Sequence, residues 1–170
     1  MALIGLKGGG VAGQESTAIS TSAQHTLGTI ALDSSGGEYI YCRGSTAVST
    51  MAAGDWVSYQ STAGEFTMAR IPTSTVFSSA RLNIGISMST ISATTSFGWV
   101  QIFGKSTIAR FDSTAQDGHA QLHLSSIAAG ALTTSTGGAP VWGANTLSSG
   151  NSSNGAAWLQ YPFLSTVAGA

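Results

Sequence analysis

The stretch Phe97-Gly98-Trp99-Val100-Gln101-Ile102-Phe103-Gly104-Lys105 decides the fold prediction for this chain. It is a run of apolar and aromatic residues with one polar break, and a glycine closes it. Because aromatic and β-branched side chains favour strands and glycine favours turns, the run predicts a buried β-strand that ends in a turn. A second strand is predicted just upstream, over Asn83–Met88.

The clearest hairpin of the sequence precedes these two strands. Leu27–Leu32 and Glu38–Arg43 are the predicted strands, the second of them rich in aromatic and β-branched residues. Asp33-Ser34-Ser35-Gly36-Gly37 connects them, and Asp, Ser and Gly supply the local hydrogen bonds and positive φ angles that turns need. The pattern therefore predicts two paired, antiparallel strands.

Further short strands extend the β pattern along the chain. They are predicted over Asp55–Tyr59, Glu65–Arg70, Gly98–Phe103, Ser106–Phe111 and His119–Leu124. A short helix over residues 121–129 competes with the last of them. Many short strands separated by regular turn signals predict an all-β fold, either an antiparallel β-sandwich or a small β-barrel.

Composition divides the chain into three segments. Residues 1–26 are rich in Gly, Ser, Thr and Ala, and Gly8–Gly10 favours neither a helix nor a packed strand, so we expect a flexible N-terminal arm. Residues 27–125 carry the predicted strands of a β-rich core domain. Residues 126–170 form the expected C-terminal extension, which is rich in Gly, Ser and Asn and has an apolar end.

The charge content is unusually low. Only 8% of the residues are charged and the net charge is −1, whereas a typical protein has about 25% charged residues. Ser and Thr make up about a quarter of the chain and Gly adds 22 residues, so hydroxyl and backbone groups supply the polar surface. A surface with so few charges is typical of a protein in a large assembly, or of an extracellular protein.

The same composition argues against several classes of protein. The basic residues are scattered, which argues against binding of nucleic acid through phosphate contacts. No apolar run approaches the roughly 18 residues of a membrane-spanning helix. The first residues lack the basic region that precedes the apolar part of a signal peptide, so we expect synthesis in a cytoplasm without export.

Few residues suggest catalysis or metal binding. A glycosidase would need two facing carboxylates, and Glu38 and Glu65 are candidates, but isolated strand glutamates usually face solvent. On a helix His119 and His123 would share a face and need only a third ligand to bind zinc. On a strand they would lie roughly 13 Å apart, too far for one ion.

Nucleophile and phosphate-binding motifs are also missing. Ser125, His119 and Asp112 can be combined into a catalytic triad on paper, but no Gly-x-Ser-x-Gly motif marks a nucleophilic serine. Gly8–Gly13 lacks the Gly-Lys-Ser/Thr of a phosphate-binding loop. We expect Cys42 to be a small buried side chain. The sequence thus predicts no catalytic residue, no metal site and no cofactor, and a protein that is not an enzyme.

Apolar side chains suggest contacts between subunits instead. Trp56 and Trp99 lie within strand patterns and are expected in the core, whereas Trp142 and Trp158 lie in the Gly/Ser-rich C-terminal part. Tryptophan is enriched at the centres of protein interfaces. The expected interface residues are Leu3, Ile4, Leu6, Trp142, Trp158, Tyr161 and Phe163.

Four segments follow one another in an order that is similar to a known family. They are L-G-T-I-A-L-D-S-S-G-G-E-Y-I-Y-C-R, A-A-G-D-W-V, N-I-G-I-S-M-S and F-G-W-V-Q-I-F-G-K, between residues 27 and 111. This order resembles the capsid decoration (cement) proteins and related head-surface proteins of tailed bacteriophages. In them a G-x-x-Y-x-Y/V strand, an A-G-D/Q-x-V turn and a G-x-x-W/V-Q-x-x-G strand follow one another. Residues 1–26 and 112–170 have no counterpart in this resemblance.

The resemblance implies a β-rich virion structural protein, often a homotrimer. Such a protein binds the outer surface of the capsid and stabilises it by bridging subunits of the major capsid protein, its expected partner. The implied location is the capsid surface of the virion, after synthesis in the host cytoplasm, and no catalytic residue comes with the resemblance. The alternative is a carbohydrate- or receptor-binding module of a phage fibre or of a tail or neck structure.

Overall fold

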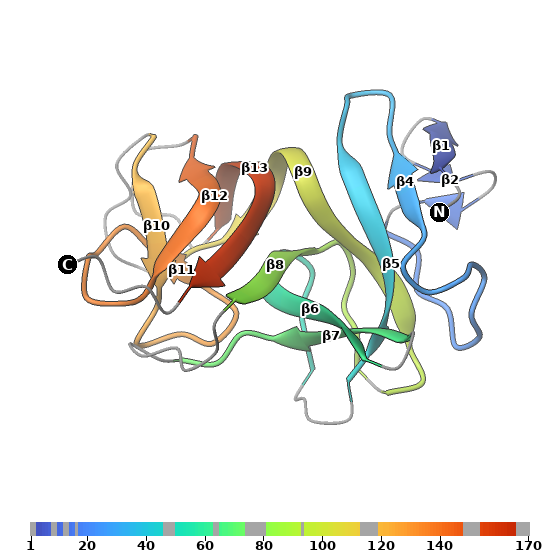
Figure 1. Ribbon diagram of the computed structural model, residues 1–170, viewed down its shortest axis with the longest axis horizontal. Coiled ribbons are helices and arrows are strands. Elements are labelled where there is room, and N and C mark those ends of the chain that lie inside the picture. The colour runs from blue at the N-terminus through green and yellow to red at the C-terminus, as the bar shows by residue number, and fades with distance from the viewer. Residues whose placement is uncertain are drawn as a thin grey trace.

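The computed structural model describes residues 3–7, 10–11, 14–15, 17–45, 50–62, 65–73, 81–92, 94–112, 119–147 and 154–165. Within these ranges the chain forms β-strands and no helix, which confirms the predicted all-β class (Figure 1). The strands are β1 (Leu3–Lys7), β2 (Gly10–Val11), β3 (Gln14–Glu15), β4 (Ile30–Leu32), β5 (Glu38–Gly44), β6 (Trp56–Thr62), β7 (Glu65–Arg70), β8 (Arg81–Ser87), β9 (Phe97–Arg110), β10 (Gln121–Leu124), β11 (Leu132–Thr133), β12 (Pro140–Thr146) and β13 (Asn154–Ser165).

Six of these strands close into a barrel. The pairing runs from β5 to β9, β13, β8, β6 and β7 and back to β5. All of these contacts are antiparallel except the short one between β5 and β7, which is parallel. In this ring each strand pairs with a neighbour on both sides, although β5 and β7 pair over only two residues of each.

Two further groups of strands pair outside the barrel, at opposite ends of the molecule (Figure 1). β12, β10 and β11 extend the sheet from β13, and β4 extends it from β5. The turn between β4 and β5 is the one predicted from the Asp-Ser-Ser-Gly-Gly sequence, and β4–β5 is the predicted hairpin. β1 pairs in parallel with β4, β2 pairs antiparallel with β1, and β3 pairs antiparallel with β2.

Two hydrophobic cores lie on opposite faces of β6. Trp56 packs in one and its neighbour Val57 in the other, because successive side chains of a strand point to opposite faces. The barrel core contains Ile40, Cys42, Met51, Val57, Tyr59, Met68, Ile91, Val100 and Ile102. The C-terminal core contains Trp56, Ile71, Ile84, Ile86, Ala109, Phe111, Leu122, Leu124, Leu132, Val141, Ala144, Ala157, Leu159 and Leu164.

The decisive stretch of the sequence belongs to a longer strand than predicted. Instead of two strands separated by a turn, β9 continues through Gly104, which adopts φ = 91°. Its first part pairs with β5 and its second part with β13. The side-chain amide of Gln101 donates to the carbonyls of Phe103 (3.3 Å) and Lys105 (3.1 Å) and stabilises this bend. The predicted turn is therefore a kink within one strand.

The region expected to be a C-terminal extension contributes to the barrel. β13 pairs with β9 over its first part and with β8 over its last residues, and so it completes the ring. It also supplies Ala157, Leu159 and Leu164 to the C-terminal core. At the other end of the chain, the backbone of Leu3–Lys7 pairs as a strand with β4. Residues 121–124 form strand β10, which settles the choice between strand and helix.

Candidate functional site: an aromatic face on β12 and β13

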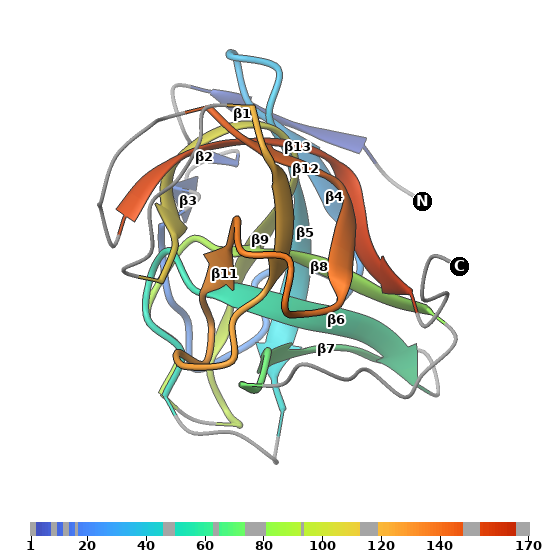
Figure 2. The same ribbon diagram turned by 90° about the vertical axis from the view of Figure 1, so that its left-hand side faces the viewer.

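Three of the large aromatic side chains predicted for an interface are exposed on one side of the sheet that β12 and β13 form, here called the C-terminal sheet. Trp142 is 44% exposed, Trp158 is 38% exposed and Tyr161 is 47% exposed. The chain neighbours of Trp142 and Trp158 on the opposite face, such as Val141 and Leu159, are fully buried in the C-terminal core. The two tryptophans therefore lie on the outer face of this sheet, which the views of Figures 1 and 2 show as a curved layer.

A bulge in β13 turns Tyr161 outward. Between the partner pairs Trp142–Phe163 and Ala144–Leu159, β12 has only Gly143, whereas β13 has residues 160–162. Tyr161 adopts φ = 51°, a left-handed conformation that costs a residue with a side chain about 1–3 kcal/mol. In a regular strand Tyr161 would point toward the core. Here β13 leaves β9 and turns to β8, and both Gln160 and Tyr161 are exposed.

Contacts with neighbouring strands hold Tyr161 in this position. Its hydroxyl donates a hydrogen bond to Glu38 Oε2 on β5 (2.7 Å). This bond, together with some burial and the charge of Glu38, raises the pKa of Tyr161 above its usual value. Its ring lies against Phe103, with 5.4 Å between the ring centroids. Tyr161 is therefore an oriented surface group.

Phe103 and Phe163 complete the group, which we call the aromatic face (Phe103, Trp142, Trp158, Tyr161 and Phe163). The ring of Phe103 also contacts Trp158 edge-on, at 6.1 Å between centroids. The guanidinium of Arg81 stacks over Phe163 at 4.2 Å, a cation–π contact. Sequence reasoning missed Phe103, although a signal existed. The side chains of Val100 and Ile102 point into the barrel core, and successive side chains of a strand point to opposite faces. Phe103 therefore lies on the other face of β9.

The three N-terminal residues that are also expected at an interface lie elsewhere in the fold. The backbone of Leu3, Ile4 and Leu6 belongs to β1, which pairs with β4 and not with β12 or β13. Figure 1 places β1 at the opposite end of the molecule from β12. The structure thus brings together four of the predicted residues, on the C-terminal sheet, and keeps the N-terminal three apart from them.

The two glutamates considered for catalysis have separate partners. Glu38 accepts the hydrogen bond of Tyr161, whereas Glu65 forms an ion pair with Arg43. Both interactions are exposed at the surface. The thiol of Cys42 is fully buried, as predicted, and burial raises its pKa well above the usual value.

Ser125 of the paper triad and His123 of the histidine pair considered for zinc both contact the backbone. Ser125 Oγ accepts the N–H groups of Ile127 (3.2 Å) and Ala128 (3.0 Å), as in a common serine turn. His123 Nδ1 lies 3.0 Å from the carbonyl oxygen of Gly138. Among the described residues, no three His, Cys, Asp or Glu side chains are placed to hold a metal ion.

Comparison with known proteins leaves the aromatic face as the main functional evidence. The chain matches no family model, no curated protein and no solved structure. In the part of the chain that the structure describes, no helix is long and apolar enough to span a membrane.

Proposed function

We propose that this protein is a non-catalytic structural protein of a phage virion that binds the outer surface of the capsid through its aromatic face. In this role it bridges subunits of the major capsid protein and so stabilises the shell. The observation that carries the proposal is the exposure of Trp142, Trp158 and Tyr161 together on one sheet. Large aromatic side chains anchor many protein interfaces, and Tyr161 is held outward by a strained bulge.

Two further observations support the proposal. With 8% charged residues, the protein has little charge to keep it apart from other proteins, as suits a subunit of a large assembly. The order of motifs between residues 27 and 111 resembles the decoration proteins of tailed phages. We further propose a homotrimer on the capsid surface, because several weak contacts held together on one particle bind far more strongly than one.

Binding to empty heads tests the proposal. The heads are assembled from the major capsid protein of the same genome, and bound protein is measured by co-sedimentation. Trp142→Ala with Trp158→Ala removes two exposed rings and leaves the buried cores intact, so the double variant should bind at least about tenfold more weakly. Light scattering on a sizing column gives the oligomeric state of the free protein.

Ile19→Ala is the control, because Ile19 is 50% exposed and lies outside the aromatic face. It should bind as the unmodified protein does. If the unmodified protein does not co-sediment with the heads, the proposal is overturned. If the double variant binds as strongly as the unmodified protein, the aromatic face is not the surface that binds the capsid.

A carbohydrate-binding module is the second candidate, and one observation favours it. Trp158 is exposed, and its neighbours across the sheet are the polar residues Asn145 on β12 and Lys105 on β9. Sugar rings stack on exposed aromatic side chains, and polar groups beside the ring bind their hydroxyls.

A glycan array and tryptophan fluorescence test this second candidate. A sugar that binds should change the fluorescence of the protein, and Trp158→Ala should abolish the change. No hit on the array, together with a fluorescence spectrum that no glycan alters, would exclude a carbohydrate-binding module.

A further inference from the structure

Arg81 lies at the border of the aromatic face, where it places a positive charge beside a ring. It is the first residue of β8, and its backbone is opposite Ser165 of β13. Leu82 packs against the C-terminal core, so Arg81 and Asn83 point to the outer side of the sheet, because successive side chains of a strand alternate between its faces. The centre of the guanidinium lies 4.2 Å from the centroid of the Phe163 ring. This contact fixes the charge on the outer surface.

Arg81 has no carboxylate partner among the described residues, unlike the other arginines of the chain. Each of those forms an ion pair, namely Arg43 with Glu65, and Arg70 and Arg110 both with Asp55. The Phe163 ring attracts the charge of Arg81 through its face, but it accepts none of the hydrogen bonds that the edge of the planar guanidinium can donate. These N–H groups are therefore available to an acceptor on a partner.

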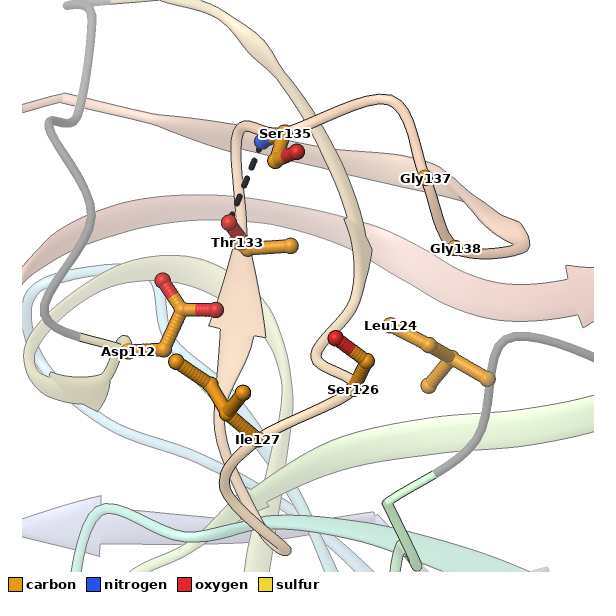
Figure 3. Close-up of a pocket in the computed structure, with 8 residues that line it drawn as sticks. All are labelled: Asp112, Leu124, Ser126, Ile127, Thr133, Ser135, Gly137 and Gly138. Carbon is orange, nitrogen blue, oxygen red and sulfur yellow. Dashed lines mark hydrogen bonds between the residues drawn. The ribbon is translucent and has the colours of Figure 1, made fainter.

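The remaining described carboxylates are bound or buried elsewhere. Glu38 accepts the hydrogen bond of Tyr161, and Asp33 accepts hydrogen bonds within the turn between β4 and β5. Asp112 is only 5% exposed and lies in the wall of a pocket of about 210 Å³ beside the end of β9, which Figure 3 shows. In the part of the chain that the structure describes, no acidic side chain therefore neutralises Arg81.

A second cation borders the same face on β9. Lys105 is exposed, and its backbone lies opposite Trp158 of β13. Like Arg81, it takes part in none of the ion pairs between described residues. Against these two cations stands the carboxylate of Glu38, which is already bound to Tyr161. The aromatic face thus carries an excess of positive charge on a chain whose net charge is −1, and this excess attracts an acidic partner.

We propose that the aromatic face binds an acidic segment of a partner protein, with an Asp or Glu carboxylate of that segment on the guanidinium of Arg81. A guanidinium offers two parallel N–H groups to one carboxylate, and apolar side chains of the segment pack on the neighbouring rings. A string of phosphates fits less well, because the charge of Glu38 offsets one of the two cations. The inference rests on the proposed function, since it names the chemistry of the surface that the aromatic face binds.

Chemical-shift titration of the full chain with two peptides tests the inference. The peptides are acetylated and amidated Glu-Pro-Leu-Pro-Glu and its uncharged counterpart Gln-Pro-Leu-Pro-Gln. The acidic peptide should shift the amide signals of Asn83 and Phe163 and the indole signals of Trp142 and Trp158 in a saturable way. It should bind about fivefold more tightly than the uncharged peptide, as an exposed ion pair allows. Salt at about 0.5 M should remove most of this difference, because it screens exposed charges.

Variants separate the charge of Arg81 from its shape. Because Arg81 is exposed, Arg81→Gln leaves both hydrophobic cores intact, and it should lose most of the preference for the acidic peptide. Arg81→Lys keeps the charge without the planar fork and should retain part of the preference. Arg43→Gln is the matched control, because Arg43 lies outside the aromatic face and already pairs with Glu65. It should bind both peptides as the unmodified protein does.

Binding to the empty heads separates this inference from the proposed function. If Arg81→Gln and the unmodified protein bind the heads equally, the inference fails and the proposed function stands. If the acidic peptide binds selectively and the heads do not bind, the inference stands and the proposed function fails.

Two results of the titration would also overturn the inference. One is that the acidic peptide causes no saturable shift, or no larger shift than the uncharged peptide. The other is that inorganic phosphate at the same concentration displaces the acidic peptide, which would assign Arg81 to a phosphate group instead.

Discussion

Asp55 is a fully buried carboxylate on which three segments of the chain converge. Its Oδ2 accepts the N–H of Ala52 (2.8 Å) and lies 3.0 Å from Arg70 Nε in an ion pair. Its Oδ1 accepts a hydrogen bond from Arg110 (2.8 Å), and the carbonyl of Arg110 in turn accepts the indole N–H of Trp56. One acidic residue thus ties β6 to β7 and β9 beside the C-terminal core.

Asp55→Ala should lower the free energy of unfolding by about 3 kcal/mol, because two arginines lose their shared partner in a partly buried site. Urea denaturation measures the loss. Glu65→Ala is the control, since its ion pair with Arg43 is exposed and worth at most about 1 kcal/mol. Similar losses for both variants would contradict the structural role of Asp55.

Asp33 gives the protein a predictable dependence on pH. Burial by itself raises the pKa of Asp33, but hydrogen bonds from Tyr39, Ser35 and Gly37 together hold it below its usual 3.8. The folded state binds the proton of Asp33 less readily than the unfolded state does. The ionised carboxylate therefore contributes to the stability of the fold, and this contribution is complete above the unfolded pKa. It is lost as the pH falls through the folded pKa.

Tyr39→Phe removes the hydroxyl that donates to Asp33 Oδ2 at 2.7 Å. The variant should be less stable than the unmodified protein at neutral pH, by about 1 kcal/mol. It should also lose less stability on acidification from about pH 5 to about pH 2. Urea denaturation at several pH values measures both effects, and two parallel stability curves would show that Tyr39 does not act through Asp33.

At the scale of elements, β9 depends on a single glycine. Gly104 has φ = 91°, and a Cβ added there would lie 3.0 Å from the Cα of Gly37 in the β4–β5 turn. The kink allows one strand to pair with β5 and then with β13, and β9 supplies Val100 and Ile102 to the barrel core and Ala109 to the C-terminal core.

Gly104→Ala should therefore destabilise the protein by about 1–3 kcal/mol, through backbone strain and the close contact with Gly37. Gly137→Ala is a matched control, because its φ is not positive and no atom lies within 4 Å of an added Cβ. That variant should differ from the unmodified protein by no more than about 0.5 kcal/mol. The reverse order of the two stabilities would refute the role of the kink.

At the scale of the whole molecule, the two ends of the chain are not equivalent. β13 pairs with β9, β12 and β8, whereas β1 pairs with β4 and β2 at the end of the sheet. β13 also contributes three side chains to the C-terminal core.

Deletion of residues 154–170 should abolish cooperative unfolding, because it opens the barrel and uncovers the C-terminal core. Deletion of residues 1–16 should leave a cooperative transition. Circular dichroism during thermal unfolding distinguishes the two outcomes. A folded, cooperative chain without β13 would show that the remaining strands close on their own.

The all-β class, the β4–β5 hairpin, and the burial of Trp56, Trp99 and Cys42 could be predicted from the amino-acid pattern. These properties are local, because period-two alternation, aromatic and β-branched residues, and turn chemistry act between residues close in the chain. The exposure of Trp142 and Trp158 could also be inferred from their position among polar and glycine residues. That the two side chains lie on the same face of one sheet could not be inferred.

The closure of the barrel and the membership of the aromatic face could not be predicted in this way. Both depend on contacts between segments far apart in the chain, such as the pairing of β13 with β8 and β9 and the contact of Phe103 with Tyr161. A local pattern reports neither a kink at Gly104 nor a bulge at Tyr161, because each is stable only when its partner strands are in place. The pocket at Asp112 has the same origin, since its walls come from three separate segments.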